Sequence, residues 1–246
     1  MESQAKAIVK IENLSKSFGD IDVFKNLSLD IFEGEIVTLI GFSGCGKSTL
    51  LKIIADLEQP SSGKVSLDQS CKLGMAFQYS ALFDSLNIAE NIAFPLMIGE
   101  NLKRRYDDKE LMEVVKEKLS LVGLPGIEQK FPSELSGGMK KRVSFARAIV
   151  HDPSLVLYDE PTAGLDPVAS TIVEDLILKV QNKVNASAIL VTHQFSTISR
   201  ASDRVVMLHG GGIVWQGTPE ELFHSDNPYA VQFRNGAPEG PMEIKH

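Results

Sequence analysis

The sequence predicts an α/β fold built on a mostly parallel sheet, and the prediction rests on three observations. Strand-like and helix-like segments alternate along most of the 246 residues. A glycine-rich loop joins a short apolar strand to a helix between residues 35 and 54. A second apolar strand, Leu155–Tyr158, runs into two adjacent carboxylates, Asp159 and Glu160. Alternating strands and helices favour parallel strands that helices cover on both faces.

Composition narrows the class of protein further. The net charge of −7 argues against bulk nucleic-acid binding, and we expect no nucleic-acid partner. The longest apolar stretches fall far below the roughly 18 residues that a membrane span requires. Only two cysteines occur, Cys45 and Cys71, as in proteins of a reducing compartment. With no export signal in Met1–Lys6, we expect a cytoplasmic protein that meets a membrane only through a partner.

The predicted strands fall on both sides of a helical region. That region, 79–131, contains two amphipathic runs, Asn87–Met97 and Asp107–Val122, with a basic loop at Lys103–Arg105 between them. We therefore predict a single domain with a core of about 1–78 and 132–223, a helical subdomain of about 79–131, and a tail, 224–246. The predicted strands are Ala7–Ile11, Leu27–Ile31, Glu35–Ile40, Lys64–Leu67, Leu73–Phe77, Leu155–Tyr158, Ala188–Thr192, Arg204–Leu208 and Gly212–Gln216.

The loop from Gly41 to Ser48 reads Gly-Phe-Ser-Gly-Cys-Gly-Lys-Ser, a complete phosphate-binding pattern. Backbone N–H groups of such a loop cradle phosphate oxygens, and the following helix adds partial positive charge. Lys47 is placed to reach the β- and γ-phosphates, and the Ser48 hydroxyl to bind Mg²⁺. Cys45 is interpreted as a small filler rather than a reactive thiol. The predicted nucleotide contacts are Gly41, Ser43, Gly44, Cys45, Gly46, Lys47, Ser48 and Thr49.

The paired carboxylates predict the rest of a hydrolytic site. At the carboxyl end of a sheet that also holds a phosphate loop, Asp159 is expected to hold Mg²⁺, and Glu160 to polarise the water that attacks the γ-phosphorus. A third element, Leu135-Ser-Gly-Gly-Met139, precedes a helix that Ser136 is placed to cap. Gly137 and Gly138 let a bound group approach the backbone closely. One nucleotide needs one phosphate loop, so this second anion site is expected to serve a second copy of the chain.

With these three elements in order, the chain resembles the ATP-binding-cassette (ABC) ATPases, whose signature motif is L-S-G-G-Q or a near variant. The resemblance runs from about Val9 to Phe223 and implies a dimer that encloses two Mg·ATP between phosphate loops and signature motifs. It also implies roles for individual residues. Phe18 stacks on adenine, Gln78 contacts Mg²⁺ and the attacking water, Asp166 belongs to the loop that crosses the dimer interface, and His193 contacts the γ-phosphate. Intact Glu160 and His193 imply an active ATPase.

Other details resemble one branch, the cassettes of Mla/Mce-type phospholipid (organic solvent tolerance) transporters. Met139 replaces the usual glutamine of the signature. The segment Ala81–Leu96 is close to the A-L-F-D-S-(M/L)-x-V-x-E-N-V-A-F-P-L pattern of that branch, and Gln232–Gly236 with Gly240-Pro241 is similar to its tail. The resemblance implies an integral-membrane permease, an Mce-domain lipid-binding protein, a small STAS-type regulatory subunit, and a location on the inner face of the cytoplasmic membrane. It also implies a tail that embraces the neighbouring cassette.

One departure and three alternatives accompany this reading. The stretch Gly63–Gln78 is shorter than in most cassettes, which trims the predicted β-subdomain. The ATPase subunit of another importer, such as one for polar amino acids, would share every catalytic residue. A non-transport ABC ATPase acting on nucleic acid or ribosomes usually carries two cassettes or long coiled-coil insertions, which this chain lacks. A regulatory subunit that only binds ATP would be opposed by Glu160 and His193.

Overall fold

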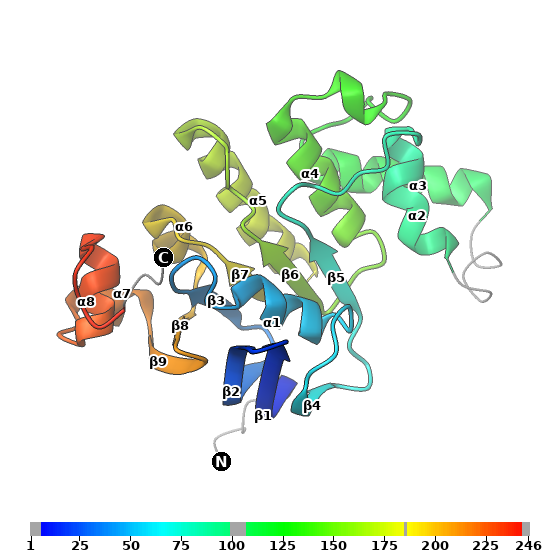
Figure 1. The fold of residues 1–246 in the computed structure, drawn as a ribbon. Coiled ribbons are helices and arrows are strands. Elements are labelled where there is room, and N and C mark those ends of the chain that lie inside the picture. The colour runs from blue at the N-terminus through cyan, green and yellow to red at the C-terminus, as the bar shows by residue number, and fades with distance from the viewer. Residues whose placement is uncertain (1–5, 99–106, 185, 243–246) are drawn as a thin grey trace, which may run out of the picture. The chain divides into compact units, whose positions relative to one another are not determined.

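The structure, a computed structural model, describes residues 6–98, 107–184 and 186–242. The predicted basic loop at Lys103–Arg105 lies outside the described residues, as do the last four residues of the chain. The fold divides into two compact units (Figure 1). The first unit combines Met1–Cys71 with Ser187–His246, and the second is Lys72–Ala186.

Four strands of the first unit are hydrogen-bonded in the order β7 (Ser187–Val191), β3 (Ile36–Ile40), β8 (Arg204–His209) and β9 (Gly212–Gly217). β3 runs parallel to β7 and β8, and β9 returns antiparallel to β8. All residues of β3 and β7 are buried, which suits strands packed on both faces. The helices of this unit are α1 (Lys47–Ile54), α6 (Phe195–Ala201), α7 (Pro219–His224) and α8 (Pro228–Asn235).

A separate antiparallel sheet in the same unit has the order β2 (Ile21–Phe32), β1 (Ala7–Phe18), β4 (Ser62–Leu67). β1 and β2 are much longer than the predicted strands, because irregular pairing carries the ladder through polar residues. Asn13 and Asn26 take left-handed φ values of 49° and 51° within these strands. Such residues are typical of turns. The local sequence therefore does not predict the full length of these strands, which pairing with the partner strand stabilises.

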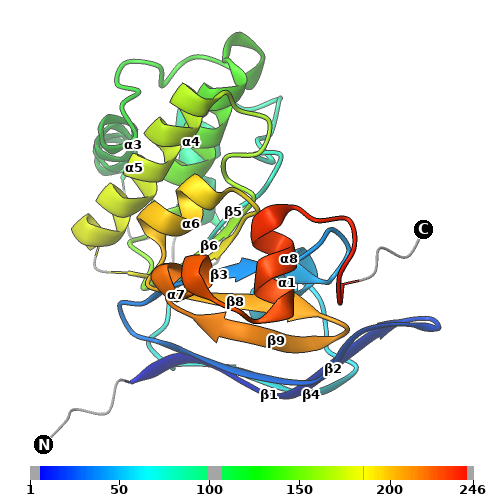
Figure 2. The same ribbon diagram turned by 90° about the vertical axis from the view of Figure 1, so that its left-hand side faces the viewer.

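An apolar cluster holds the first unit together around the start of the phosphate loop. In Figure 2, β8 and β9 lie between the three-stranded sheet and the helices α7 and α8. Phe42, just beyond β3, packs against this cluster. Its buried members are Ile40, Ile198, Val205, Met207, Leu222, Ala230, Phe233 and Met242.

The second unit contains two parallel strands, β5 (Leu73–Ala76) and β6 (Leu155–Asp159). Its helices are α2 (Ile88–Met97), α3 (Asp108–Leu121), α4 (Gly137–Ala148) and α5 (Pro167–Val184), with a short 3₁₀ turn η1 at Pro132–Glu134. α4 packs against α2, α3 and β5. Capping boxes begin α2 at Asn87 and α3 at Asp107, which fixes the starts of both predicted helices.

The α/β fold class is therefore confirmed, with parallel central strands and an antiparallel sheet beside them. The division into core, helical subdomain and tail stays a prediction. The helices α6, α7 and α8 were not predicted, and α8 lies inside the expected tail. Within residues 6–98, 107–184 and 186–242, no helix combines the length and the apolar character needed to cross a membrane.

Candidate functional site

The phosphate loop lies in the first unit, between β3 and α1. Gly46 occupies the N-cap position of α1 with φ 103°, so no side chain covers the first-turn amides, which have no partner within the helix. Gly41 and Gly46 are required by the fold itself. A Cβ on Gly41 would collide with the Leu208 carbonyl oxygen, and one on Gly46 would lie 2.7 Å from the Phe24 ring.

Lys47 is buried, and its ammonium group bonds to the loop. Nζ donates to the carbonyl oxygens of Gly41 at 2.8 Å and Phe42 at 3.1 Å. These bonds hold the ammonium over the loop, where phosphate oxygens would replace the carbonyls as acceptors. Burial raises the pKa of the Cys45 thiol, although nearby Lys47 opposes the shift. A raised pKa favours the protonated thiol, which suits the interpretation of Cys45 as a filler.

The strand register brings His193 to the same edge of the sheet as the phosphate loop. Leu39 of β3 lies opposite Val191 of the parallel strand β7. Gly41 and His193 each follow two residues after these paired positions. His193 is exposed, whereas Thr192 before it is fully buried and accepts a hydrogen bond from Gln194 N. Parallel strands that end together present ligand-binding groups together.

Phe18, the predicted adenine platform, ends β1 with its ring about half exposed. Lys16 lies two residues earlier on the same face of the strand, and its Nζ sits 4.5 Å from the ring centroid. Lys16 is anchored by Glu58 Oε1 at 2.6 Å and by the Gln59 carbonyl at 2.7 Å. An anchored cation on one face of the ring leaves the other face for stacking.

The remaining predicted groups lie in the second unit. Ala76 of β5 lies opposite Tyr158 of the parallel strand β6, and Gln78 and Glu160 each follow two residues after this pair. Asp159, the last residue of β6, is buried. The structure thus brings Gln78, Asp159 and Glu160 to one strand edge, as Gly41 and His193 share another.

Glu160 adopts a left-handed backbone conformation with φ 46°, which is unusual for a residue with a Cβ. Its carbonyl oxygen accepts from Ala163 N at 3.1 Å and from Lys141 Nζ at 3.2 Å. A tight turn follows, and Gly164 takes φ 75°. Strain of this kind concentrates at functional sites, where surrounding contacts hold it in place.

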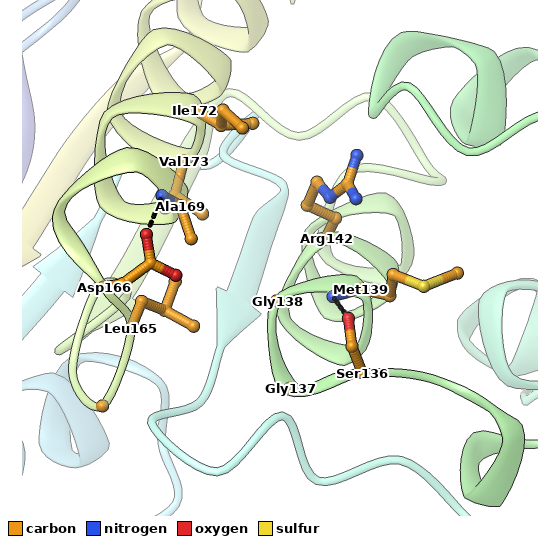
Figure 3. Close-up of a pocket in the computed structure, with 11 residues that line it drawn as sticks. Ser136, Gly137, Gly138, Met139, Arg142, Leu165, Asp166, Ala169, Ile172 and Val173 are labelled. Atoms are coloured by element: carbon orange, nitrogen blue, oxygen red, sulfur yellow. Dashed lines mark hydrogen bonds between the residues drawn. The ribbon is translucent and has the colours of Figure 1, made fainter.

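Ser136 caps α4 as predicted, because its Oγ accepts from Met139 N at 3.3 Å. The start of α4 faces the loop before α5 across a cavity of 360 Å³ (Figure 3). Asp166 caps α5 across the cavity, accepting from Val168 N and Ala169 N at 3.0 Å. The cavity is lined by Ser136, Gly137, Gly138, Met139, Arg142, Gly164, Leu165, Asp166, Ala169, Ile172 and Val173.

The two signature glycines face open space. A Cβ on Gly137 would meet nothing within 4 Å, and one on Gly138 would only reach Leu165 Cδ2 at 4.0 Å. Neither backbone is in the left-handed region. The fold of the chain therefore does not require glycine at these positions, unlike Gly41 and Gly46. A group that approaches the α4 N-terminus from outside would require it.

An apolar groove of 410 Å³ lies beside the segment that follows Gln78. The rings of Phe83 and Phe94 line it with their centroids 4.5 Å apart and their planes tilted by 52°, and Phe83 is 40% exposed. Arg147 of α4 donates to the carbonyls of Ser80 and Ala81 at 2.8 and 2.7 Å, which fixes the rim. Arg147 and Lys16 were not predicted from the sequence. A charged residue on the apolar face of a predicted helix, and a lysine alternating with an exposed aromatic, were the signals.

The predicted metal ligands suit Mg²⁺ chemically. Ser48, Gln78 and Asp159 supply one hydroxyl, one amide and one carboxylate oxygen. Magnesium sites in phosphoryl-transfer proteins commonly use one or two carboxylates together with phosphate and water. In the described residues no group of three or more histidines, cysteines or carboxylates could hold a metal ion.

Comparisons with known proteins identify the family of the chain. Residues 24–163 match the ABC transporter family. Protein TRIGALACTOSYLDIACYLGLYCEROL 3, chloroplastic, from Arabidopsis thaliana is 42% identical over 272 residues, covering 98% of this chain and 77% of that protein. The probable ribonucleotide transport ATP-binding protein mkl from Mycobacterium leprae is 39% identical over 95% of this chain and 70% of its own length.

A third relative and a solved structure complete the comparison. The intermembrane phospholipid transport system ATP-binding protein MlaF from Haemophilus influenzae is 34% identical, covering 97% of this chain and 94% of its own. The ATP-binding cassette MJ0796, solved as a dimer bound to ADP and Pi, superposes with a TM-score of 0.76 at 30% identity over 86% of this chain and 98% of that one. The chain belongs to the ABC transporter family, as one of its ATP-binding, ATP-hydrolysing subunits.

Proposed function

We propose that this subunit energises phospholipid transport across or between bacterial membranes through a separate permease. ATP binds at Gly41–Thr49 with its adenine on the open face of Phe18. Ser48, Gln78 and Asp159 would hold Mg²⁺, which would neutralise charge on the transferred phosphoryl group. Glu160 polarises the attacking water and His193 orients it against the γ-phosphate.

A second copy completes each site. The signature segment Ser136–Met139 of one subunit binds the γ-phosphate of the nucleotide on the other, and Asp166 lies in the loop at that interface. The observation that carries this proposal is the open space over Gly137 and Gly138. Glycines that the fold does not need, at a capped helix N-terminus, are explained by an anion that contacts the backbone. The dimeric state of MJ0796 supports the same arrangement.

The apolar groove beside Phe83 is the proposed permease contact. Phe77 lines the groove and stands next to Gln78, so a helix docked here would touch the residue before a proposed Mg²⁺ ligand. ATP-driven closure then moves the permease, and phosphate release reopens the pair. The subunit is accordingly placed on the inner face of the cytoplasmic membrane.

Phospholipid as the cargo is supported by the name of one relative, and a glycerolipid more broadly by the name of a second. MlaF is named for intermembrane phospholipid transport, and its length is almost fully covered. The Arabidopsis relative, whose name contains a glycerolipid, has the higher identity. An Mce-domain lipid-binding protein and a small STAS-type subunit would complete such a complex. The mkl name points instead to ribonucleotides, so the cargo needs its own test.

Two experiments test the ATPase mechanism and the identity of the cargo separately. Glu160→Gln should trap an ATP-bound dimer with little turnover, and wild-type hydrolysis by this variant would remove Glu160 from its role. For the cargo, the tagged subunit is purified gently from its native membranes, and co-purifying proteins and lipids are identified by mass spectrometry. A multi-span permease with an Mce-domain protein and phospholipid supports the proposal. A permease with a solute-binding protein, such as one for polar amino acids, overturns the cargo and leaves the ATPase chemistry in place.

A further inference from the structure

Helix α4 connects the signature segment with the backbone of Glu160. Lys141 lies one turn into α4, and only 8% of its surface is exposed. Its Nζ donates to the Glu160 carbonyl oxygen at 3.2 Å. The helix that begins at the signature glycines therefore contacts the residue proposed to activate water.

The contact adds a second hydrogen bond to the peptide group that follows Glu160. The Glu160 carbonyl also accepts from Ala163 N at 3.1 Å, so two donors occupy the two acceptor sites of one oxygen. With φ at 46°, the backbone of Glu160 is in an unfavourable region that only external contacts maintain. Rotating this peptide would swing the Glu160 side chain, because both share the same Cα.

The lysine is held at a cost in solvation. Burial lowers the pKa of Lys141, and the nearby Glu160 charge opposes that shift. A buried ammonium group needs polar partners to offset its lost hydration. A lysine that only filled space here would be better replaced by an apolar side chain.

The same helix reaches a second part of the proposed site. Two turns beyond Lys141, Arg147 donates to the carbonyls of Ser80 and Ala81, which directly follow the Gln78 segment. One rigid helix thus holds the chain beyond β6 and the chain beyond β5. A displacement of its N-terminus would be transmitted to both.

We propose that Lys141 is a positioning residue, which fixes the Glu160 backbone so that the carboxylate points at the attacking water. Because Lys141 belongs to α4, the orientation of the carboxylate then depends on the position of that helix. Occupation of the signature segment by the partner's nucleotide then sets the geometry of the glutamate in the same subunit. This inference rests on the proposed role of Glu160.

The first test compares single variants in the assembled transporter. Lys141→Met keeps the length of the side chain and removes its donor and charge. It should lower kcat roughly tenfold or more, with KM for ATP changed by less than about twofold. Lys141→Arg, which restores a cationic donor, should recover most of kcat. Lys140→Met, a charge-matched control one residue earlier, should keep near wild-type kcat.

The second test distinguishes an effect on the orientation of residue 160 from an effect on formation of the dimer. In the Glu160→Gln background, adding Lys141→Met should leave the ATP-induced dimer intact by size-exclusion chromatography, since only the orientation of residue 160 is disturbed. Loss of that dimer, or a large rise in KM, would show that Lys141 acts on nucleotide binding, and the inference would be wrong. An unchanged kcat in Lys141→Met would overturn it equally.

Folding failure is guarded against by Lys141→Leu, a second variant that lacks a donor. If Lys141→Met lowers the melting temperature strongly, the kcat of the leucine variant decides the question by the same criteria. The proposed function fails differently, since Glu160→Gln alone would then hydrolyse ATP at the wild-type rate. An inactive Glu160→Gln with a fully active Lys141→Met and Lys141→Leu rejects only the inference about Lys141.

Discussion

The side chain of Gln232 holds both backbone polar groups of Met242: Oε1 accepts from Met242 N at 2.8 Å, and Nε2 donates to Met242 O at 3.0 Å. Met242 is fully buried in the apolar cluster beneath α8. A Cβ on Gly240 would collide with the Gln232 side chain, so position 240 requires glycine. The described part of the tail is therefore packed on its own subunit, while its predicted embrace of a neighbouring cassette stays a prediction.

Gln232→Ala should destabilise the first unit by about 1–3 kcal/mol, because two buried backbone groups lose their partners. Urea denaturation followed by tryptophan fluorescence would measure this, since Trp215 packs against the same cluster. Gln216→Ala, at an exposed position on β9, is the matched control and should change stability little. Equal midpoints for the two variants would mean that the Gln232 contacts contribute nothing.

Gly138→Ala should separate folding from function. Its added methyl group would enter open space in the isolated subunit, so the melting temperature should stay within a few degrees of wild type. ATP-induced dimerisation and hydrolysis should fall roughly tenfold or more, because the methyl group blocks close approach of a phosphate. Gly46→Ala is the contrasting variant, and it should unfold the phosphate loop because a Cβ would press on Phe24. Full ATPase activity in Gly138→Ala would contradict the proposed signature contact.

Lys47→Ala should weaken ATP binding by roughly tenfold or more, since charge-assisted hydrogen bonds to phosphate are among the stronger polar contacts. Titration with a fluorescent ATP analogue would give the dissociation constant. Lys52→Ala, on the exposed side of the same helix, should bind as wild type does. The prediction does not survive if both variants bind equally well.

The free energy of unfolding should decrease as the pH is lowered, because of the protonation of His151. Its Nε2 lies 3.1 Å from the Leu73 carbonyl oxygen, and burial lowers its pKa. Above the unfolded value of about 6.5, both states are neutral and the full stability is present. As pH falls below about 6.5, the unfolded chain takes up a proton that the folded chain resists, so stability is lost.

A His151→Phe variant isolates this effect. It should be less stable than wild type near pH 7.5, because the Leu73 carbonyl loses a partner. Between about pH 7 and 5, however, its urea midpoint should decline less steeply than that of wild type. Parallel curves over that range would show that His151 does not titrate as its buried position indicates.

The sequence was most informative where structure is local. The apolar strand before Gly41, the helix start at Lys47 and the cap at Ser136 each depend on a few consecutive residues. These were predicted with nearly correct bounds. The interpretation of Cys45 as a small filler stays a prediction.

The sequence was least informative where distant segments meet. The long pairing of β1 with β2 runs through Asn13 and Asn26, whose local preference is for turns. α8 was overlooked although Asn227 and Gly236 form its caps, since the stretch beyond Phe223 is rich in asparagine, proline and glycine. The Lys141 contact with Glu160 spans 19 residues, and no pattern within either segment announces it.

The pairing of Leu39 with Val191 constrains the number of residues between each strand and the functional group that follows it. Gly41 and His193 stand equally far along neighbouring strands, so one inserted residue on either side would shift one group by about 3.3 Å against the other. Changes in packing can accommodate a substitution between the paired residues and Gly41 or His193. An insertion or deletion there would change the relative positions of these two groups. Among functional relatives, we expect the number of residues from each strand to its polar group to vary less than the residues themselves.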